Sequence, residues 1–398
     1  MTAQQALHYI HGLHSRGIRP GLERMHTALA AVGHPERRLR VIHIAGTNGK
    51  GSTAEMLRCV LTAGGYRVGA YTSPTVTTLQ DTITINGQPI SGRELAVLTD
   101  RLIATGAELT EFEFVTVLAL LWFAEKQVDF AVVECGLGGR EDATNVFPAP
   151  LCAVFTPISL DHTKLLGDSV AAIATQKAGI IKPSCAVVCS PDQPPEALAA
   201  IQAEATKYGL TVRQPSHACK VPLLAMHGEH QQQNARTVCE IAAVLRERGY
   251  TLPEQAVATG LAAAALPCRQ ELVTGTPPIL LDGAHNPDGI AALVSTVREQ
   301  WPDTPVILLT GMLADKNVIA CAELLAPIAV KVICCTPNHP DRAMSAAELA
   351  THYPGAIACA DVSTALEQAK RLAINKNLPL VVAGSFYLAA EVRRLLRI

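Results

Sequence analysis

The sequence lacks an excess of charge of either sign. Its 398 residues contain 33 Lys and Arg against 35 Asp and Glu, which gives a formal net charge of −2. Interspersed charges of this kind provide no basic face for nucleic acid and no polybasic tail for a membrane surface. We therefore expect small-molecule partners, with no nucleic acid and no membrane among them.

Long apolar runs and paired cysteines are also missing. No stretch approaches the roughly 18 uninterrupted apolar residues of a spanning helix, and Met1 to Gly12 shows no basic region followed by an apolar run. This favours a cytoplasmic enzyme. The 12 cysteines include no Cys-x-x-Cys pair. We therefore expect reduced, mostly buried thiols rather than a disulfide scaffold or a cysteine metal site.

Two series of apolar, strand-like runs alternate with helix-length segments. The first covers 41–45, 68–72, 128–135, 151–156 and 184–189, and the second covers 279–282, 306–310, 330–336, 357–360 and 378–383. This alternation predicts an α/β fold with mostly parallel sheets covered by helices. The chain is long enough for two domains, and prolines, glycine and threonines interrupt the helical pattern in 266–278. We place the domains at 1–270 and 271–398.

Residues 45–53, Ala-Gly-Thr-Asn-Gly-Lys-Gly-Ser-Thr, stand between a strand-like and a helix-like run. Their glycines let backbone N–H groups turn toward a phosphate, and the helix N-terminus and Lys50 add positive charge. An extra glycine separates Lys50 from Ser52, so the match to the usual phosphate-loop pattern is imperfect and a merely glycine-rich turn is the alternative. The position between strand and helix favours the phosphate site.

Polar residues follow several of the predicted strands. Glu134 ends the run 130–133, where a carboxylate points into the ligand crevice of an open α/β sheet and can hold Mg²⁺, unless it is only solvated. The pair Asp161-His162 follows the next strand. Alone it is more typical of a hydrogen-bonded structural histidine, but with Glu134 and the phosphate loop at neighbouring strand ends it suggests a second metal position. In the second series, Asp282 and His285 lie in a strand-to-helix turn that also reads as an Asn286 cap with Pro287 in the first helical position. By spacing alone, Lys177 is a surface lysine near a helix end.

These segments together resemble the folylpolyglutamate synthase and dihydrofolate synthase family, a branch of the Mur-ligase-like amide ligases, in the right order along nearly the whole chain. The matching motifs are Gly21-Leu22-Glu23-Arg24, 43–52, Thr72-Ser73-Pro74, Phe112-Glu113-Phe114, 134–145, Asp161-His162-Thr163, Leu166-Gly167, 177–180, His230-Gln231, Asn234-Ala235, 282–287, Gly311-Met312-Leu313, Asp315-Lys316 and Gly384-Ser385. The resemblance implies a P-loop-containing Mur-ligase-like central domain and a smaller Rossmann-like C-terminal domain on the amino-acid side.

The resemblance also implies an activity: an ATP- and Mg²⁺-dependent ligase, commonly a monomer, that activates dihydropteroate or a folate as an acyl phosphate and joins it to the amino group of L-glutamate. Lys50, Lys177 and His285 match catalytic positions, and Lys177 matches a family lysine that can be carbamylated. The nucleotide-binding positions are Gly46, Thr47, Asn48, Gly49, Lys50, Gly51, Ser52, Asn234, Arg269 and Asp282. The metal positions are Ser73, Glu134 and His162, and the substrate positions are His285 and Ser385.

The chain departs from the family pattern where relatives line the pterin-carboxylate side. Ser73-Pro74-Thr75-Val76 replaces Ser-Pro-His-Leu, and 79–83 lacks the family's arginines. The stretch 190–231 is shorter than in typical members, and Cys268 replaces a glycine. Two alternatives therefore stay open beside the folate ligase: a sister ligase that uses the same chemistry on a non-folate carboxylate or another amine, and an ATP-binding module without ligase activity.

Overall fold

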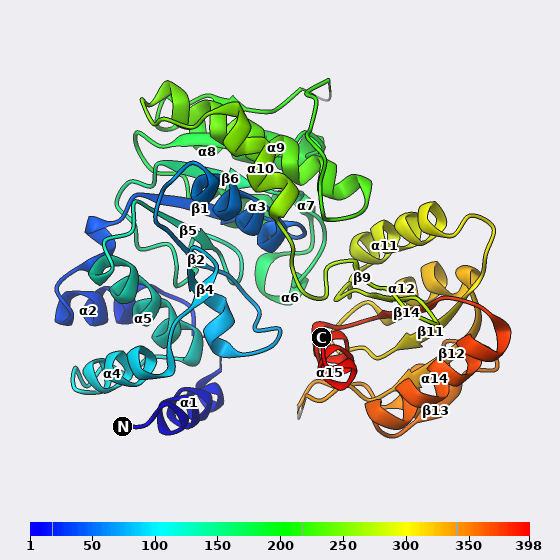
Figure 1. The fold of residues 1–398 in the computed structure, drawn as a ribbon. Coiled ribbons are helices and arrows are strands. Elements are labelled where there is room, and N and C mark those ends of the chain that lie inside the picture. Colours follow the sequence, from blue (N-terminus) through cyan, green and yellow to red (C-terminus); the bar gives the residue numbers. More distant parts are fainter. Residues whose placement is uncertain (18, 217, 340) are drawn as a thin grey trace. The chain divides into compact units, whose positions relative to one another are not determined.

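The computed structural model describes residues 1–17, 19–216, 218–339 and 341–398, which form two compact units (Figure 1). Unit 1 comprises 1–225 and 232–265, and unit 2 comprises 226–231 and 266–398. The units thus change after Ala265, at the start of the interrupted segment 266–278, whereas the sequence analysis drew its boundary after residue 270. The short segment 226–231, which includes the first turn of α9, also belongs to unit 2.

Unit 1 is built on a sheet in the order β4-β3-β2-β5-β1-β6-β7-β8, with β3 and β4 antiparallel and the other pairs parallel. Its strands are β1 (Val41–Ala45), β2 (Val68–Tyr71), β3 (Ile83–Ile85), β4 (Gln88–Pro89), β5 (Phe130–Glu134), β6 (Cys152–Phe155), β7 (Ala186–Cys189) and β8 (Val212–Arg213). The helices are α1 (Ala3–Gly12), α2 (Glu23–Ala31), α3 (Lys50–Ala63), α4 (Gly92–Ile103), α5 (Glu111–Glu125), α6 (Thr163–Leu166), α7 (Val170–Ala178), α8 (Pro195–Thr206), α9 (Glu229–Glu247) and α10 (Glu254–Ala263).

Both faces of this sheet are covered. On one face, α1, α2, α4 and α5 form a continuous apolar core with β2, β5 and β1, while α7 and α8 pack over β6 and β7. Helix α5 is buried along nearly its whole length, which explains its almost uninterrupted apolar sequence. Helix α3 packs on the sheet as well, and α10 packs directly against α3. This close approach is possible because Gly260 of α10 has no side chain: a Cβ there would clash with the backbone of Val60.

Unit 2 has a second sheet in the order β13-β12-β11-β14-β10-β9, in which only the edge pair β10–β9 is antiparallel among the pairings described. The strands are β9 (Glu271–Val273), β10 (Ile279–Leu281), β11 (Val306–Thr310), β12 (Ala329–Cys335), β13 (Ile357–Cys359) and β14 (Leu380–Ala383). The helices are α11 (Pro287–Gln300), α12 (Val318–Leu325), α13 (Ala346–Ala350), α14 (Val362–Lys376) and α15 (Phe386–Leu396).

Alternate residues of these strands face two separate apolar cores. Helices α11, α12 and α13 cover one face and α14 and α15 cover the other. Strands buried on both faces read as continuous apolar runs, and this is why the sequence located them. The predicted fold class, two mostly parallel α/β sheets with a smaller second unit, is confirmed.

Two further findings concern surfaces and thiols. In the described part of the chain no helix combines the length and apolar character needed to cross a membrane. All 12 cysteines are free thiols and ten are buried, as expected for reduced residues in apolar strands.

Candidate functional site

The carboxyl ends of neighbouring strands gather the predicted residues of unit 1 at one edge of its sheet. Strand β1 lies between β5 and β6, with Ile44 opposite Glu134 and Ala45 opposite Phe155. Strand β2 pairs with β5 in parallel, so Ser73, two residues beyond the end of β2, belongs to the same edge. In open α/β sheets this edge is where ligands bind.

The loop from β1 to α3 requires glycine at two positions. Gly46 and Gly49 have φ values of +153° and +84°. A Cβ at Gly46 would lie 1.8 Å from Thr156 Oγ1, and one at Gly49 would lie 2.5 Å from Asn234 Oδ1. Asn234 of α9, which is only 2% exposed, therefore packs against the loop.

Two N–H groups of this loop already have acceptors inside unit 1. The backbone N–H groups of Thr47 and Asn48 donate to Pro157 O at 2.9 and 3.3 Å. Gly51 and Ser52 lie buried in the first turn of α3. The first N–H groups of a helix lack intrahelical acceptors and carry its positive dipole end. The start of α3 is therefore the part of the loop suited to a phosphate.

Lys50 and Glu134 form the charged centre of this edge. Lys50 Nζ lies 3.8 Å from Glu134 Oε1, and it donates to Thr47 O at 3.3 Å. Glu134 Oε2 accepts a hydrogen bond from the backbone N–H of Ser73 at 3.2 Å. Both charged side chains are largely buried, so their charges are little screened by solvent.

Lys177 is buried beside the phosphate loop, and the surface position predicted from its spacing is wrong. It is 5% exposed, and its Nζ donates to Gly46 O at 2.8 Å. Burial, followed by the nearby charge of Lys50, lowers the pKa of Lys177 to about 7. The spacing rule failed because the covering segment is the distant loop after β5, which a helical repeat cannot reveal.

That covering segment packs on the backbone around Lys177. A Cβ at Gly139 would lie 2.5 Å from Lys177 O, and a Cβ at Gly179 would lie 2.5 Å from Arg140 Cβ. Asn145 Nδ2 donates to Arg140 O at 3.0 Å and to Gly179 O at 3.1 Å. The glycines of the segment 135–145 thus allow the close approach that buries Lys177.

His162 is the most exposed of the predicted metal residues. It is the N-cap residue that precedes the short helix α6, and it has a left-handed conformation with φ +50°. Its backbone N–H donates to Asp161 Oδ1 at 2.8 Å, and its ring Nε2 lies 3.9 Å from Asp161 Oδ2. The side chain of His162 is 38% exposed, and Asp161, its neighbour in the chain, lies close to its ring.

The donor set suits a magnesium ion that arrives with a nucleotide. Among the described residues, no group of three or more His, Cys, Asp or Glu side chains is arranged to hold a metal. Mg²⁺ is commonly held by one or two carboxylates, with substrate phosphates and water completing its shell. The buried carboxylate of Glu134 beside Ser73 meets this requirement.

The sequence assigned no role to a buried polar network behind this edge. The His43 ring Nε2 lies 2.8 Å from Thr144 Oγ1 and 3.1 Å from Cys135 Sγ. Thr144 Oγ1 donates in turn to Asp142 Oδ1 at 2.5 Å. Burial lowers the pKa of His43 to about 3, so the ring is neutral. The network ties the segment after β5 to β1, and all four residues lie within motifs that the sequence analysis quoted.

The predicted residues of unit 2 collect at the carboxyl ends of β10 and β14. Asp282 accepts hydrogen bonds from the N–H groups of Gln270 and Ala284 at 3.0 and 2.6 Å. Burial raises the pKa of Asp282 to about 6, against the opposing effect of Arg269. The Arg269 guanidinium lies 4.3 Å from the centre of the Phe386 ring. Asp282 and Arg269 are therefore held by neighbours within unit 2.

His285 and Ser385 lie beside this group. His285 Nδ1 donates to Gly283 O at 2.9 Å. The His285 ring contacts the Phe386 ring edge-on. Ser385 caps α15 by accepting from Leu388 N at 3.1 Å. The alternative reading of the 282–287 turn is also confirmed, since Asn286 caps α11.

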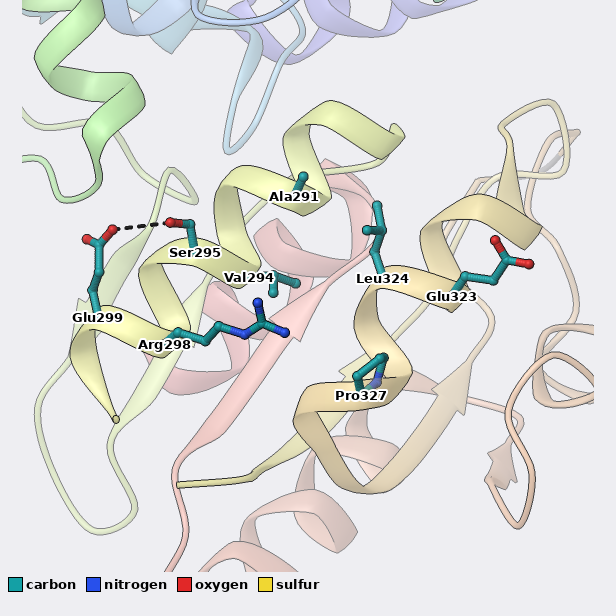
Figure 2. A pocket seen from close by; sticks show the side chains of 8 residues that line it. All are labelled: Ala291, Val294, Ser295, Arg298, Glu299, Glu323, Leu324 and Pro327. Carbon is teal, nitrogen blue, oxygen red and sulfur yellow. Dashed lines mark hydrogen bonds between the residues drawn. The ribbon is translucent and has the colours of Figure 1, made fainter. Parts of the chain in front are cut away.

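A separate surface pocket lies between α11 and α12 (Figure 2). Its lining residues are Ala291, Val294, Ser295, Arg298, Glu299, Glu323, Leu324 and Pro327. Figure 2 shows Glu299 accepting a hydrogen bond from Ser295 and the Arg298 side chain extending between the two helices. None of these eight residues is a predicted site residue, so the pocket is distinct from the strand-end group.

The phosphate loop and the two α/β units indicate a nucleotide-binding enzyme, and comparison with known families identifies its class as the Mur ligases. Residues 44–242 match the Mur ligase middle domain, and residues 268–386 match the Mur ligase glutamate ligase domain.

The curated relatives narrow the class. The chain is 37% identical to the dihydrofolate synthase/folylpolyglutamate synthase of Bacillus subtilis, with 81% of this chain and 83% of that protein covered. It is 34% identical to the folylpolyglutamate synthase of Lacticaseibacillus casei, with 100% and 99% covered. The chain belongs to the folylpolyglutamate synthase and dihydrofolate synthase family.

Solved structures agree with this assignment. E. coli FolC in complex with DHPP and ADP superposes with a TM-score of 0.90 at 29% identity, covering 100% of this chain and 98% of that one. Mycobacterium tuberculosis folylpolyglutamate synthase complexed with ADP and AMPPCP gives 0.88 at 30% identity, with 99% and 98% covered. The predicted family is confirmed.

Proposed function

We propose that this chain is an ATP-dependent ligase that activates the carboxylate of dihydropteroate or a folate as an acyl phosphate and joins it to L-glutamate. The observation that carries the proposal is the Lys50–Glu134 pair at the start of α3, beside the buried Lys177. The names of the relatives, which are dihydrofolate and folylpolyglutamate synthases, support the choice of substrates.

The first step is transfer of the terminal phosphoryl group of ATP. A carboxylate oxygen of the substrate attacks the γ-phosphorus, and ADP leaves. Such transfers depend on positioning and charge neutralisation rather than on covalent help from the protein. Lys50 and the N-terminus of α3 stabilise the added negative charge. Glu134 and Ser73 would hold Mg²⁺, which supplies further charge neutralisation at the phosphates.

The second step forms the amide bond. The glutamate amine attacks the acyl carbon, inorganic phosphate leaves, and the amine loses a proton. We assign His285 to this step; the hydrogen bond from its Nδ1–H to Gly283 O, which orients the ring, supports the assignment. We assign Ser385 to the binding of glutamate. We assign Arg269, Asp282 and Asn234 to the binding of the nucleotide.

Lys177 has the chemistry for carbamylation. With its pKa lowered to about 7, a large fraction of its amine is neutral near neutral pH, and a neutral amine adds CO₂ with loss of a proton. The product is an anion in place of a cation. Because Lys50 destabilises the charged form of Lys177, carbamylation replaces a repulsion between the two side chains by an attraction. We propose that the modified Lys177 supports a metal ion.

We propose that the chain acts as a monomer in the cytoplasm on small molecules. These proposals rest on the balanced charge of the sequence and on the family resemblance. Size-exclusion chromatography with light scattering tests the first, and localisation of a tagged chain tests the second.

A second candidate function uses the same chemistry on a different carboxylate. Residues 72–91, which follow β2, contain no Arg, Lys or His. In this segment Thr78 and Asp81 bond to each other instead, with 2.9 Å between Thr78 N and Asp81 Oδ2. The absence of cations where the family pattern has arginines concerns the identity of the carboxylate, and it is the observation that supports a sister ligase beside the folate ligase.

One panel of assays separates the three. ATP, Mg²⁺ and L-glutamate are incubated with dihydropteroate, tetrahydrofolate or unrelated carboxylates, and phosphate release is measured, with Lys50→Ala as the control. Release that requires a pterin substrate is the expected result. Release with another carboxylate alone would indicate the sister ligase, and ATP binding without any carboxylate-dependent release would indicate a binding module.

A further inference from the structure

The buried side chain of Gln193 lies in the loop after β7, outside every motif discussed above. Its Nε2 donates to Phe155 O at 3.1 Å and to Thr156 O at 2.7 Å. Its Oε1 accepts from Ile158 N at 3.2 Å. Gln193 is 9% exposed, so these three bonds satisfy an amide that would otherwise be buried without partners. A single side chain thereby fixes the backbone that follows β6.

The backbone fixed by Gln193 in turn holds the phosphate loop. Pro157 O accepts the N–H groups of Thr47 and Asn48. Thr47 Oγ1 donates to Ser159 O at 3.1 Å and accepts from Ser159 N at 3.0 Å. One residue earlier, the side chain of Thr156 occupies the space above Gly46. The segment 155–159 is thus bonded to Gln193 on one side and to the phosphate loop on the other.

This arrangement matters because a phosphate loop works by fixed geometry. Backbone donors stabilise charge well only if they are already oriented, since reorienting them on binding costs free energy. Residues 46–48 lie outside any helix or strand, so no regular backbone hydrogen bonding fixes their conformation. The hydrogen bonds to Pro157 and Ser159 hold residues 47 and 48 in place. The hydrogen bonds of Gln193 in turn hold the segment 155–158 in place.

We propose that Gln193 is a positioning residue for ATP: it does not touch the nucleotide, but orders the β6 loop that orders the phosphate loop. The proposal rests on the proposed function in one respect, the binding of ATP at the start of α3. It adds a determinant of nucleotide affinity in the loop after β7, a strand that lies two places from β1 in the sheet.

The test compares two variants by calorimetric titration with Mg²⁺ and the nonhydrolysable analogue AMPPCP. Gln193→Met keeps the size of the side chain and removes all three bonds. Gln214→Met is the matched control, because Gln214 Nε2 donates to Ser190 O at 3.0 Å in the same neighbourhood but does not bond to 155–159. We expect Kd to rise about tenfold in Gln193→Met, equivalent to about 1.4 kcal/mol, and less than about twofold in the control.

A double-mutant cycle distinguishes positioning from a general loss of stability. Thr47→Val removes the side-chain link between the phosphate loop and Ser159. If Gln193 acts through this link, the Kd of Gln193→Met combined with Thr47→Val rises less than the product of the two single effects. We also expect KM for ATP to rise more than KM for the carboxylate in Gln193→Met. Circular dichroism at the titration temperature verifies that each variant is folded.

If Gln193→Met does not fold, the same titration with AMPPCP is carried out on Gln193→Glu. It retains the shape and the acceptor but sets a carboxylate against Phe155 O and Thr156 O, so Kd should again rise. An unchanged Kd in the folded variants, equal effects of Gln193→Met and Gln214→Met, or fully independent effects in the cycle would overturn the proposal. Failure of the wild-type chain to bind AMPPCP would instead refute the proposed nucleotide site.

Discussion

The buried Lys177 predicts a specific dependence of stability on pH. Its pKa is lowered from 10.5 to about 7 in the folded chain, mainly because burial penalises the charged form. A group with a depressed folded-state pKa contributes stability above its unfolded value, and that stability is lost as the pH falls through its folded value. The stability that depends on Lys177 therefore grows between about pH 7 and pH 10.5.

The size of the effect follows from the same shift. One pKa unit corresponds to about 1.4 kcal/mol, and between pH 6 and pH 9 the folded chain releases a proton that the unfolded chain keeps. Integration over this interval gives a gain of about 2 to 3 kcal/mol in the free energy of unfolding. Lys177→Met removes the titrating group but keeps most of the buried volume, so this gain should be absent from the variant.

The assay is urea unfolding at pH 6 and pH 9 in buffer freed of CO₂, which prevents carbamylation. Trp122 lies buried in unit 1 and Trp301 lies in unit 2. In a Trp301→Phe background, tryptophan fluorescence reports unit 1 alone. We expect the difference in unfolding free energy between wild type and Lys177→Met to change by about 2 to 3 kcal/mol across this range.

Lys376→Met, which removes an exposed lysine at the end of α14, serves as the control and should change little at either pH. A constant difference between wild type and Lys177→Met at pH 6 and pH 9 would refute the reasoning. It would show that Lys177 is solvated in solution or compensated by a partner when charged.

Three further predictions concern the same molecule. Gly46→Ala should destabilise unit 1 by about 2 to 5 kcal/mol and abolish AMPPCP binding, because its Cβ would lie 1.8 Å from Thr156 Oγ1. The control is Gly12→Ala, which should change the melting temperature little because open space surrounds Gly12. Lys50→Met should lower kcat for ATP-dependent phosphate release at least about 100-fold, and a kcat within tenfold of wild type would contradict its role. Arg24→Met should cost about 2 kcal/mol in a urea titration, because it leaves the buried carboxylate of Glu113 without the guanidinium that lies 2.7 Å away; a cost below about 0.5 kcal/mol would show that the pair contributes little.

The sequence predicted the central strands and the phosphate loop because their signals are local. Val41–Ala45 is apolar throughout, glycines follow it at once, and a helical pattern begins at Lys50. The antiparallel strands β3, β4 and β9 were not predicted, because they have only two or three residues each and no apolar run. Their pairing is decided by the sheet they join rather than by their own sequence.

The site was predictable in its motifs but not in its supporting contacts. Glu134 and Lys50 could be named because strand ends and glycine-rich turns have recognisable sequences. The burial of Lys177 depends on Gly139. The order of the β6 loop depends on Gln193, whose Oε1 accepts from the backbone N–H of Ile158, 35 residues away. Long-range hydrogen bonds to backbone atoms leave no periodic signal, so only the structure identifies them.

The proposed acyl phosphate can be tested most directly with dihydropteroate labelled with ¹⁸O in its carboxylate, incubated with the chain, ATP, Mg²⁺ and L-glutamate. The labelled oxygen that attacks the γ-phosphorus stays with the phosphate when the glutamate amine displaces it. Mass spectrometry should therefore find one ¹⁸O in the inorganic phosphate for each amide formed. Amide formation with unlabelled phosphate would contradict the acyl-phosphate mechanism, and ATP turnover without any amide product would contradict the ligase itself.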